Sequence, residues 1–226
     1  MIVPPDPDAL APDPSFDAVR GPPVDAARLT APALRARFGQ ELSWQVEQAS
    51  DGRIFLPERP LRPAAVLIGL RQHADGLHVL FTVRSPHLQD HAGQVSFPGG
   101  RVDAGDAGPI DAALREAREE VRLDADRVEV LGTLPVYRTV SSYLVTPVVG
   151  LIPGDAALKA DPTEVDEFFE VPLSYLMDSA NHRRLLVVQE AKPRALYAME
   201  YLAQRRYLIW GATAAMLRNF YRFLSA

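Results

Sequence analysis

The chain has no cysteine, which excludes disulfide bonds and thiol chemistry and is typical of a protein from a reducing compartment. It also lacks a long apolar run. The N-terminus shows no basic segment followed by an apolar stretch, and no segment has the length needed to cross a bilayer. A cytoplasmic protein is therefore expected.

Positive charge is in short supply. Twenty-nine acidic residues outnumber 24 Lys and Arg, which gives a net charge of −5. This balance argues against nonspecific binding to nucleic acid, whose phosphates require a basic surface. Among the five histidines, His91 lies in a loop and indicates a hydrogen-bonding residue rather than a catalyst. With 47% hydrophobic and 23% charged residues, the 226-residue chain has the composition of a compact globular protein.

The prolines divide the chain unevenly. Residues 1–23 hold seven of the twenty, which predicts a Pro-rich arm over residues 1–24, either disordered or lying along its own domain or a partner subunit. Residues 25–60 are predicted to form a helical extension. Within it, residues 26–38 have the pattern of a helix, and Pro32 marks its expected true start. Residues 61–226 are predicted to form the main domain.

Within that domain the predicted pattern is mixed, with pairs of strands and helices on both sides of them. Residues 64–71 and 77–84 read as a hairpin that turns at Gly76, and two more strands are predicted over 128–137 and 143–152. Helices are predicted over 172–177 and 210–224. On the second helix an apolar stripe at helical spacing predicts core packing, formed by Leu217, Phe220, Tyr221 and Leu224. The fold class expected from this pattern is an α/β/α sandwich.

The segment from Gly99 to Leu123, GGRVDAGDAGPIDAALREAREEVRL, places a Gly-rich turn before a helix. At about 100° per residue, Glu116, Glu119 and Glu120 fall within about 100° of one another. The predicted core face is the opposite one, formed by Ile110, Leu114, Ala117 and Val121. Three carboxylates on one rigid element suit a hard cation such as Mg²⁺ or Mn²⁺. The alternative is a solvated acidic face, with Arg115 and Glu119 as an i,i+4 pair.

This segment resembles the Nudix box, in which a Gly and a Glu precede Arg-Glu-apolar-x-Glu-Glu-x-Gly-apolar. The matching residues are Gly100, Arg115, Glu116, Ala117, Glu119, Glu120 and Leu123. Asp106 stands in place of the first Glu, the gap before Arg115 is one residue longer, and Arg122 replaces the Gly near the end of the helix. The resemblance implies a Nudix fold, an α/β/α sandwich around a mixed β-sheet, and an Mg²⁺- or Mn²⁺-dependent hydrolase.

The segment just upstream, LFTVRSPHLQDHAGQVSFPGG, resembles the signature of Nudix coenzyme A pyrophosphatases. The residues in register are Thr82, Arg84, Ser85, Gly93, Phe97, Pro98, Gly99 and Gly100. Gln89 occupies a place where this signature prefers Arg. Further matches continue downstream, so the resemblance covers residues 62–226. It implies cleavage of coenzyme A or its derivatives into 3′,5′-ADP and 4′-phosphopantetheine or its acyl form.

Site roles follow from the resemblance. Glu116, Glu119 and Glu120 are the expected metal ligands. Glu164, in the DPTEV segment, is a candidate general base, and Glu119 or Glu120 is the alternative base. Glu164 could instead be a surface carboxylate without a catalytic role. Arg84, Gly99, Gly100 and Arg138 are candidate substrate contacts, and a homodimer is a further expectation. The alternatives are a Nudix enzyme for another nucleotide diphosphate, such as ADP-ribose or a dinucleotide, and a non-catalytic Nudix binding module.

Overall fold

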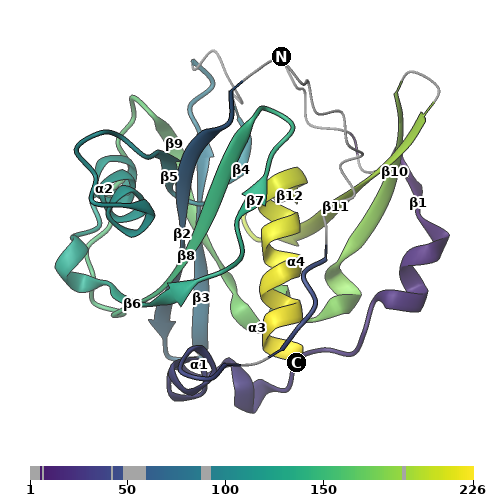
Figure 1. Cartoon of the computed structure of the whole chain (residues 1–226), viewed down its shortest axis with the longest axis horizontal. Coiled ribbons are helices and arrows are strands. Elements are labelled where there is room, and N and C mark those ends of the chain that lie inside the picture. Colours follow the sequence, from purple (N-terminus) through teal and green to yellow (C-terminus); the bar gives the residue numbers. More distant parts are fainter. Residues whose placement is uncertain (1–5, 7, 42, 48–59, 88–92, 190–191) are drawn as a thin grey trace.

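The computed structural model describes residues 6, 8–41, 43–47, 60–87, 93–189 and 192–226, and arranges them around two β-sheets (Figure 1). The larger sheet has eight strands: β2 (Arg62–His73), β3 (Gly76–Arg84), β4 (Val95–Ser96), β5 (Gly99–Arg101), β6 (Glu129–Thr133), β7 (Tyr137–Arg138), β8 (Tyr143–Ile152) and β9 (Val165–Pro172). The four-stranded sheet consists of β1 (Ala11–Pro12), β10 (Arg183–Gln189), β11 (Lys192–Leu202) and β12 (Arg206–Trp210).

The larger sheet is mixed. Strands β2 and β8 run parallel over their full length, whereas β3, β5, β6 and β9 pair antiparallel with their neighbours. The β2–β3 hairpin predicted from the sequence is present, and it turns at Gly76, whose φ of +131° suits glycine. Instead of one strand over 128–137 there are two, β6 and β7, with the buried Leu134 between them.

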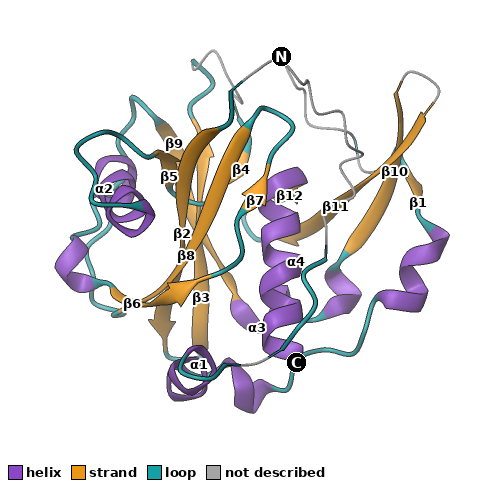
Figure 2. Ribbon diagram, viewed as in Figure 1, coloured by secondary structure: helices purple, strands orange, loops and turns teal. Residues whose placement is uncertain are grey.

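The helices cover both faces of this sheet (Figure 2). Helix α2 (Pro109–Val121) packs on one face, where its alanines meet Ala65, Leu67 and Val148 in one apolar core. Helix α4 (Gly211–Ser225) lies on the other face within the larger core. The predicted stripe on α4 is confirmed as packing, because Leu217, Phe220, Tyr221 and Leu224 are all buried. The chain therefore has the α/β/α sandwich expected of a Nudix fold.

The remaining helices are short. Helix α1 (Ala31–Phe38) begins within one residue of the start predicted at Pro32. The Thr30 hydroxyl before it accepts a hydrogen bond from the Ala33 N–H. The first half of the predicted helix is a separate 3₁₀ turn, η2 (Ala26–Leu29). Helix α3 (Leu173–Leu176) follows β9, and three more 3₁₀ turns are η1 (Pro14–Val19), η3 (Ala125–Arg127) and η4 (Ser179–Asn181). Among the described helices, none has the length and apolarity required to span a membrane.

The orientation of α2 agrees with the prediction in part, because Ala117 and Val121 of the predicted core face are fully buried. Ile110, placed on the core face, is 41% exposed, whereas the Glu120 residue is only 2% exposed. The face of α2 that meets the sheet is centred on Ala113 and Ala117, both fully buried. Small side chains let the helix approach the sheet closely, and this rotation carries Glu116 and Glu120 to the helix–sheet junction.

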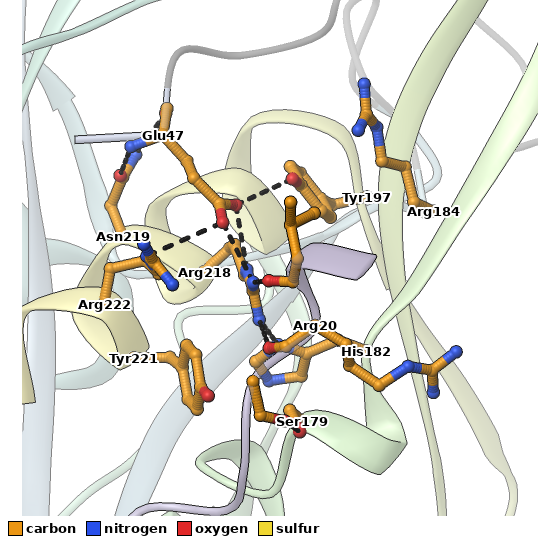
Figure 3. Close-up of polar contacts among 12 residues, drawn as sticks. Arg20, Glu47, Ser179, His182, Arg184, Tyr197, Arg218, Asn219, Tyr221 and Arg222 are labelled. Atoms are coloured by element: carbon orange, nitrogen blue, oxygen red, sulfur yellow. Dashed lines mark hydrogen bonds and ion pairs between the residues drawn. The ribbon is translucent and has the colours of Figure 1, made fainter. Parts of the chain in front are cut away.

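The N-terminal arm lies along its own domain, one of the two arrangements considered from its composition. Strand β1 pairs antiparallel with β10, and Phe16 is buried in the main core. Backbone carbonyls of Val19 and Arg20 accept hydrogen bonds from the buried Arg218 of α4, which also forms an ion pair with Glu47 (Figure 3). The boundaries at residues 24 and 60 remain predictions.

Candidate active site

Strands β4 and β5 carry a wedge of chain into the gap where β2 and β3 diverge. Strand β4 pairs with the end of β3, β5 pairs with the start of β2, and the Pro98 carbonyl accepts a hydrogen bond of 2.8 Å from the Leu67 N–H. The wedge ends in Gly99 and Gly100 directly beside α2.

Both glycines are required by close contacts. A Cβ atom on Gly99 would lie 2.7 Å from the Cα atom of Val66, and one on Gly100 would overlap the carboxylate of Glu116. A side chain at either position would push β5 away from β2 or from α2. The glycine pair thus lets β5 and the carboxylate-bearing helix come together.

Three carboxylates meet at this junction. Glu116 and Glu120 come from α2, and Glu164 comes from the loop before β9; one oxygen atom of each lies within 4.8 Å of the other two. The Glu120 side chain is 2% exposed and that of Glu116 is 14% exposed. Glu119 is outside this cluster and its side chain is 49% exposed. The structure thus brings Glu164 to two of the three predicted ligands of the helix.

The protonation of these groups reflects their surroundings. The pKa of Glu120 is raised to about 8, chiefly by burial; the charge of Arg84 opposes this rise, and the neighbouring Glu116 and Glu164 carboxylates add to it. Burial also raises the pKa of Glu116 above its usual range. In addition, Glu120 Oε2 is buried with no hydrogen-bond partner among the described residues. Clustered carboxylates with an unpartnered buried oxygen fit a divalent cation, which supplies the missing positive charge.

The loop that carries Glu164 is fixed at both ends. At the α2 end, the Asp161 N–H donates to the Glu120 carbonyl (2.9 Å), and the Asp161 carbonyl accepts from the Glu164 N–H (3.1 Å). At the β3 end, the Ser85 N–H donates to the Glu164 carbonyl (2.9 Å). Asp161 also accepts hydrogen bonds from the Thr163 N–H and hydroxyl, an Asx turn.

The sequence interpretation missed the anchoring role of Asp161. Its signal was the DPT tripeptide, since Asp followed by Pro and Thr is typical of such a turn. The position of Glu164 is thus fixed by hydrogen bonds of the backbone on both sides of it.

Arg115 ties the α2 carboxylates to the preceding loop. Its guanidinium donates to Asp106 (2.9 and 3.0 Å), to Glu116 (3.0 Å) and to Glu119 (3.1 Å). The remaining donor reaches the Arg101 carbonyl at 3.0 Å. Hydrogen bonds from Arg115 lower the pKa of Asp106, so this carboxylate remains charged. Asp106 therefore holds Arg115, and Arg115 holds Glu116.

Among the predicted substrate contacts, Arg84 lies at the carboxylate cluster. It ends β3, and its Nη1 atom is 3.8 Å from Glu120 Oε1. Arg138 is exposed on β7, which pairs with the start of β8. Gln89 and His91 fall outside the described residues. The structure therefore groups Arg84, Gly99, Gly100, Glu116, Glu120 and Glu164, with Glu119 at the margin.

A comparison with protein families matches the description NUDIX domain to residues 60–194, more than half of the chain. The chain belongs to the Nudix family. It is similar to "Uncharacterized Nudix hydrolase NudL" of Escherichia coli (strain K12), at 44% identity over 159 residues, which are 70% of this chain and 80% of that relative. The protein of the same description from Shigella boydii serotype 18 gives the same identity and coverage.

Solved Nudix structures are more distant. The Nudix hydrolase RenU of M. smegmatis is 22% identical, covers 51% of this chain and 73% of its own, and has a TM-score of 0.44. As a Nudix hydrolase, this protein is an enzyme of a family that acts on small nucleotide substrates with a divalent metal ion. The segment that resembles the Nudix box, residues 99–123, contains β5 and α2.

Proposed function

We propose that this Nudix hydrolase cleaves the pyrophosphate bond of coenzyme A or its derivatives, giving 3′,5′-ADP and 4′-phosphopantetheine or its acyl form. The observation that carries the proposal is the position of the coenzyme A-type signature beside the carboxylates. Arg84 faces Glu120, the Ser85 N–H binds the Glu164 carbonyl, and Gly100 contacts Glu116. The residues that resemble the subfamily pattern are thus the immediate neighbours of the catalytic cluster.

Mg²⁺ or Mn²⁺ is the proposed cofactor, held by Glu116, Glu120 and Glu164, with Glu119 as the further predicted ligand on the exposed margin. Such a cation polarises phosphoryl oxygens and lowers the pKa of bound water. Burial of the cluster makes its charge–charge interactions strong, because less water screens them.

The residues of the chain divide the remaining tasks. Arg84 reaches the cluster from β3, and a planar guanidinium suits a phosphate oxygen pair. Glu164 is the proposed general base, since it joins the cluster from an element other than α2 and can therefore face the attacked phosphorus from a separate direction. Glu119 and Glu120 remain the alternative bases. Arg138, exposed on β7, is a second proposed phosphate contact.

A second candidate is hydrolysis of another nucleotide diphosphate, such as ADP-ribose or NADH. The observation that favours it is Gln89, which replaces the arginine preferred by the coenzyme A signature. A non-catalytic binding module is disfavoured because Glu116, Glu119 and Glu120 are all retained. A cytoplasmic location and a homodimer accompany the proposal as expectations.

Product analysis by mass spectrometry tests the substrate. The protein is incubated with Mg²⁺ or Mn²⁺ and equal amounts of coenzyme A, 3′-dephospho-coenzyme A, ADP-ribose and NADH. Preferential formation of 3′,5′-ADP from coenzyme A supports the proposal. Preferential cleavage of ADP-ribose or NADH overturns it in favour of the second candidate. The Glu120→Gln variant serves as the control that shows the activity to be the protein's own.

A further inference from the structure

Two arginines converge on Tyr143 at the edge of the larger sheet. Arg62 begins β2 in register with Tyr143, which begins β8, and its guanidinium carbon lies 4.1 Å from the centre of the Tyr143 ring. Arg101 ends β5, with its guanidinium carbon 5.9 Å from the same ring centre and its Nε–H donating to the Tyr143 hydroxyl at 3.2 Å. One aromatic side chain thus orders two cationic groups.

Neither cation is neutralised by the part of the chain that the structure describes. Arg62 and Arg101 have no ion pair with a described carboxylate, whereas Arg71, Arg115, Arg218 and ten other arginines have one. This contrast occurs in a protein with a net charge of −5. Two neighbouring guanidinium groups repel each other, so an anion between them is favoured.

This pair is joined to the catalytic cluster through β5. Gly100 contacts Glu116, and the next residue, Arg101, accepts a hydrogen bond from Arg115 at its carbonyl oxygen (3.0 Å). Successive residues of a strand point to opposite faces, so the Arg101 side chain lies on the face away from Glu116. A ligand that reaches both the carboxylate cluster and the Arg62–Arg101 pair therefore passes the edge of β5.

Exposed apolar side chains occur on the chain segments that lead into β2 and β8. Leu61 immediately precedes Arg62. Val136 and Val140 lie on either side of β7, the short strand that is followed by a turn at residues 139–142 and then by β8. They are 39%, 56% and 43% exposed, and they are three of the seven large apolar side chains that the described chain leaves exposed. The Arg62 N–H donates to the Ser142 carbonyl at 3.0 Å, which fixes the strand start against this turn. Cations beside an apolar surface suit a phosphorylated nucleoside.

We infer that Arg62 and Arg101, ordered by Tyr143, form a second phosphate subsite that binds the phosphomonoester on the ribose of a nucleotide whose pyrophosphate lies at the carboxylate cluster. The inference rests on the proposed function, because coenzyme A carries such a 3′-phosphate. Each guanidinium offers paired donors to phosphate oxygens. The subsite therefore discriminates nucleotides by their ribose phosphate, separately from the bond that is cleaved.

Calorimetric binding of 3′,5′-ADP and 5′-AMP to the protein in EDTA tests the subsite without turnover. The two probes share the 5′-phosphate and differ by the 3′-phosphate alone. We expect the wild-type protein to bind 3′,5′-ADP at least about tenfold more tightly, as one or two charge-assisted hydrogen bonds provide. Arg62→Gln and Arg101→Gln each reduce this ratio, and the double variant brings it close to one.

Two further variants sharpen the test. Arg118→Gln is the matched control, because Arg118 is an exposed arginine on α2 that also lacks a described carboxylate partner, and it leaves the ratio unchanged. Tyr143→Phe retains the ring and removes the acceptor of the Arg101 hydrogen bond, so it reduces the ratio in part. Circular dichroism of each variant confirms folding.

Equal affinities of the wild-type protein for the two probes overturn the inference. A ratio that survives in the folded double variant also overturns it. If the enzyme cleaves ADP-ribose rather than coenzyme A but retains an Arg62- and Arg101-dependent ratio, the proposed substrate fails and the subsite stands. If coenzyme A and 3′-dephospho-coenzyme A are cleaved with equal kcat/KM, the pyrophosphatase function stands and the subsite fails.

Discussion

Arg84 and Glu120 face each other in the candidate active site without forming a hydrogen bond. Arg84 Nη1 lies 3.8 Å from Glu120 Oε1, beyond hydrogen-bonding distance. Both Arg84 Nε and Glu120 Oε2 are buried and have no hydrogen-bond partner among the described residues. Both groups therefore remain available to ligands of opposite kinds, a cation that displaces the proton of Glu120 and an anionic phosphate at Arg84.

Glu120→Gln tests the metal site. At pH 7 the metal-free folded protein holds Glu120 largely protonated, because its pKa is about 8, whereas the unfolded chain ionises it. Glutamine removes this cost of protonation, so we expect the metal-free protein at pH 7 to gain about 1–3 kcal/mol in its free energy of unfolding. The same variant should lose at least about 100-fold in kcat, because a neutral amide is a poor ligand for a hard cation. Chemical denaturation in EDTA and turnover with saturating Mg²⁺ measure the two effects.

Glu119→Gln is the matched control for that variant. Glu119 is adjacent in sequence but half exposed and paired with Arg115. We expect no stabilisation of the metal-free protein and a smaller loss of kcat, while Glu119→Gln/Glu120→Gln loses nearly all turnover and still folds. Retained turnover in the double variant contradicts the assignment of the metal site.

Glu164→Gln tests the carboxylate outside the Nudix helix. Because its oxygen lies within 4.8 Å of oxygens of Glu116 and Glu120, we expect kcat to fall by about 100-fold or more, within the range of general acid–base catalysis. Glu167→Gln, three residues along and paired with Arg205 at the surface, should keep wild-type turnover. A Glu164→Gln rate near wild type at saturating metal removes Glu164 from the mechanism.

The pattern of the sequence predicted the helix, its glutamates and the Gly-rich turn before it, since these depend on local spacing and on glycines. It predicted the buried side of α2 only in part, because Ala117 and Val121 are buried whereas Ile110 is exposed. Apolar residues such as Ile110 suggested the core face, but the alanines decide the packing because the sheet approaches too closely for larger side chains. Glu120 is buried although it is polar, so a pattern of apolar residues does not predict its burial.

The pairing of β1 within the smaller sheet escaped prediction for a different reason, because it is nonlocal, whereas β10, β11 and β12 pair with their neighbours in sequence. Strand β10 pairs with β1, about 170 residues away in sequence, through Ala11 and Leu186. A contact of such separation leaves no local periodicity to detect. The pairing of Glu164 with the α2 carboxylates is likewise nonlocal, and it was suggested only by family resemblance.

Arg122→Gly tests the strained end of the Nudix helix. Arg122 adopts the left-handed conformation at φ 57° and ψ 25°, where the family pattern has glycine. We expect the glycine variant to be more stable by about 0.5–1 kcal/mol, because the Cβ strain is relieved and the exposed ion pair with Asp161 contributes little. Arg122→Ala retains the strain and loses the ion pair, so it should show no gain. Equal unfolding free energies for the two variants contradict this account.

The buried ion pair between Glu47 and Arg218 should hold the N-terminal extension on α4. Arg218 is fully buried and donates to both Glu47 oxygens (2.8 and 2.9 Å), and Glu47 also accepts from Tyr197 (2.7 Å; Figure 3). Glu47→Gln leaves a buried cation without its counter-charge, which should cost about 3–5 kcal/mol of unfolding free energy. The double variant Glu47→Leu/Arg218→Met should recover part of that loss. A double variant less stable than Glu47→Gln argues against the pair as the dominant contact.

The same network makes stability depend on His182. The pKa of His182 is lowered to about 4, chiefly by burial and with a smaller contribution from the Arg218 guanidinium. The ring accepts a hydrogen bond from Arg218 at Nδ1 and donates from Nε2 to the Leu176 carbonyl (2.7 Å). The unfolded chain binds a proton near pH 6.5 and the folded chain does not, so stability is complete above that pH and decreases as the pH falls. Between pH 6.5 and 4.5 the decrease should be about 2 kcal/mol.

We expect His182→Gln, which keeps a donor and an acceptor, to lack this pH-dependent part of the unfolding free energy. The difference between wild-type and variant unfolding free energies isolates it from the opposite effect of Glu120, whose raised pKa favours the folded state at lower pH. Parallel pH profiles for the two proteins would show that His182 is accessible to protons in the folded state.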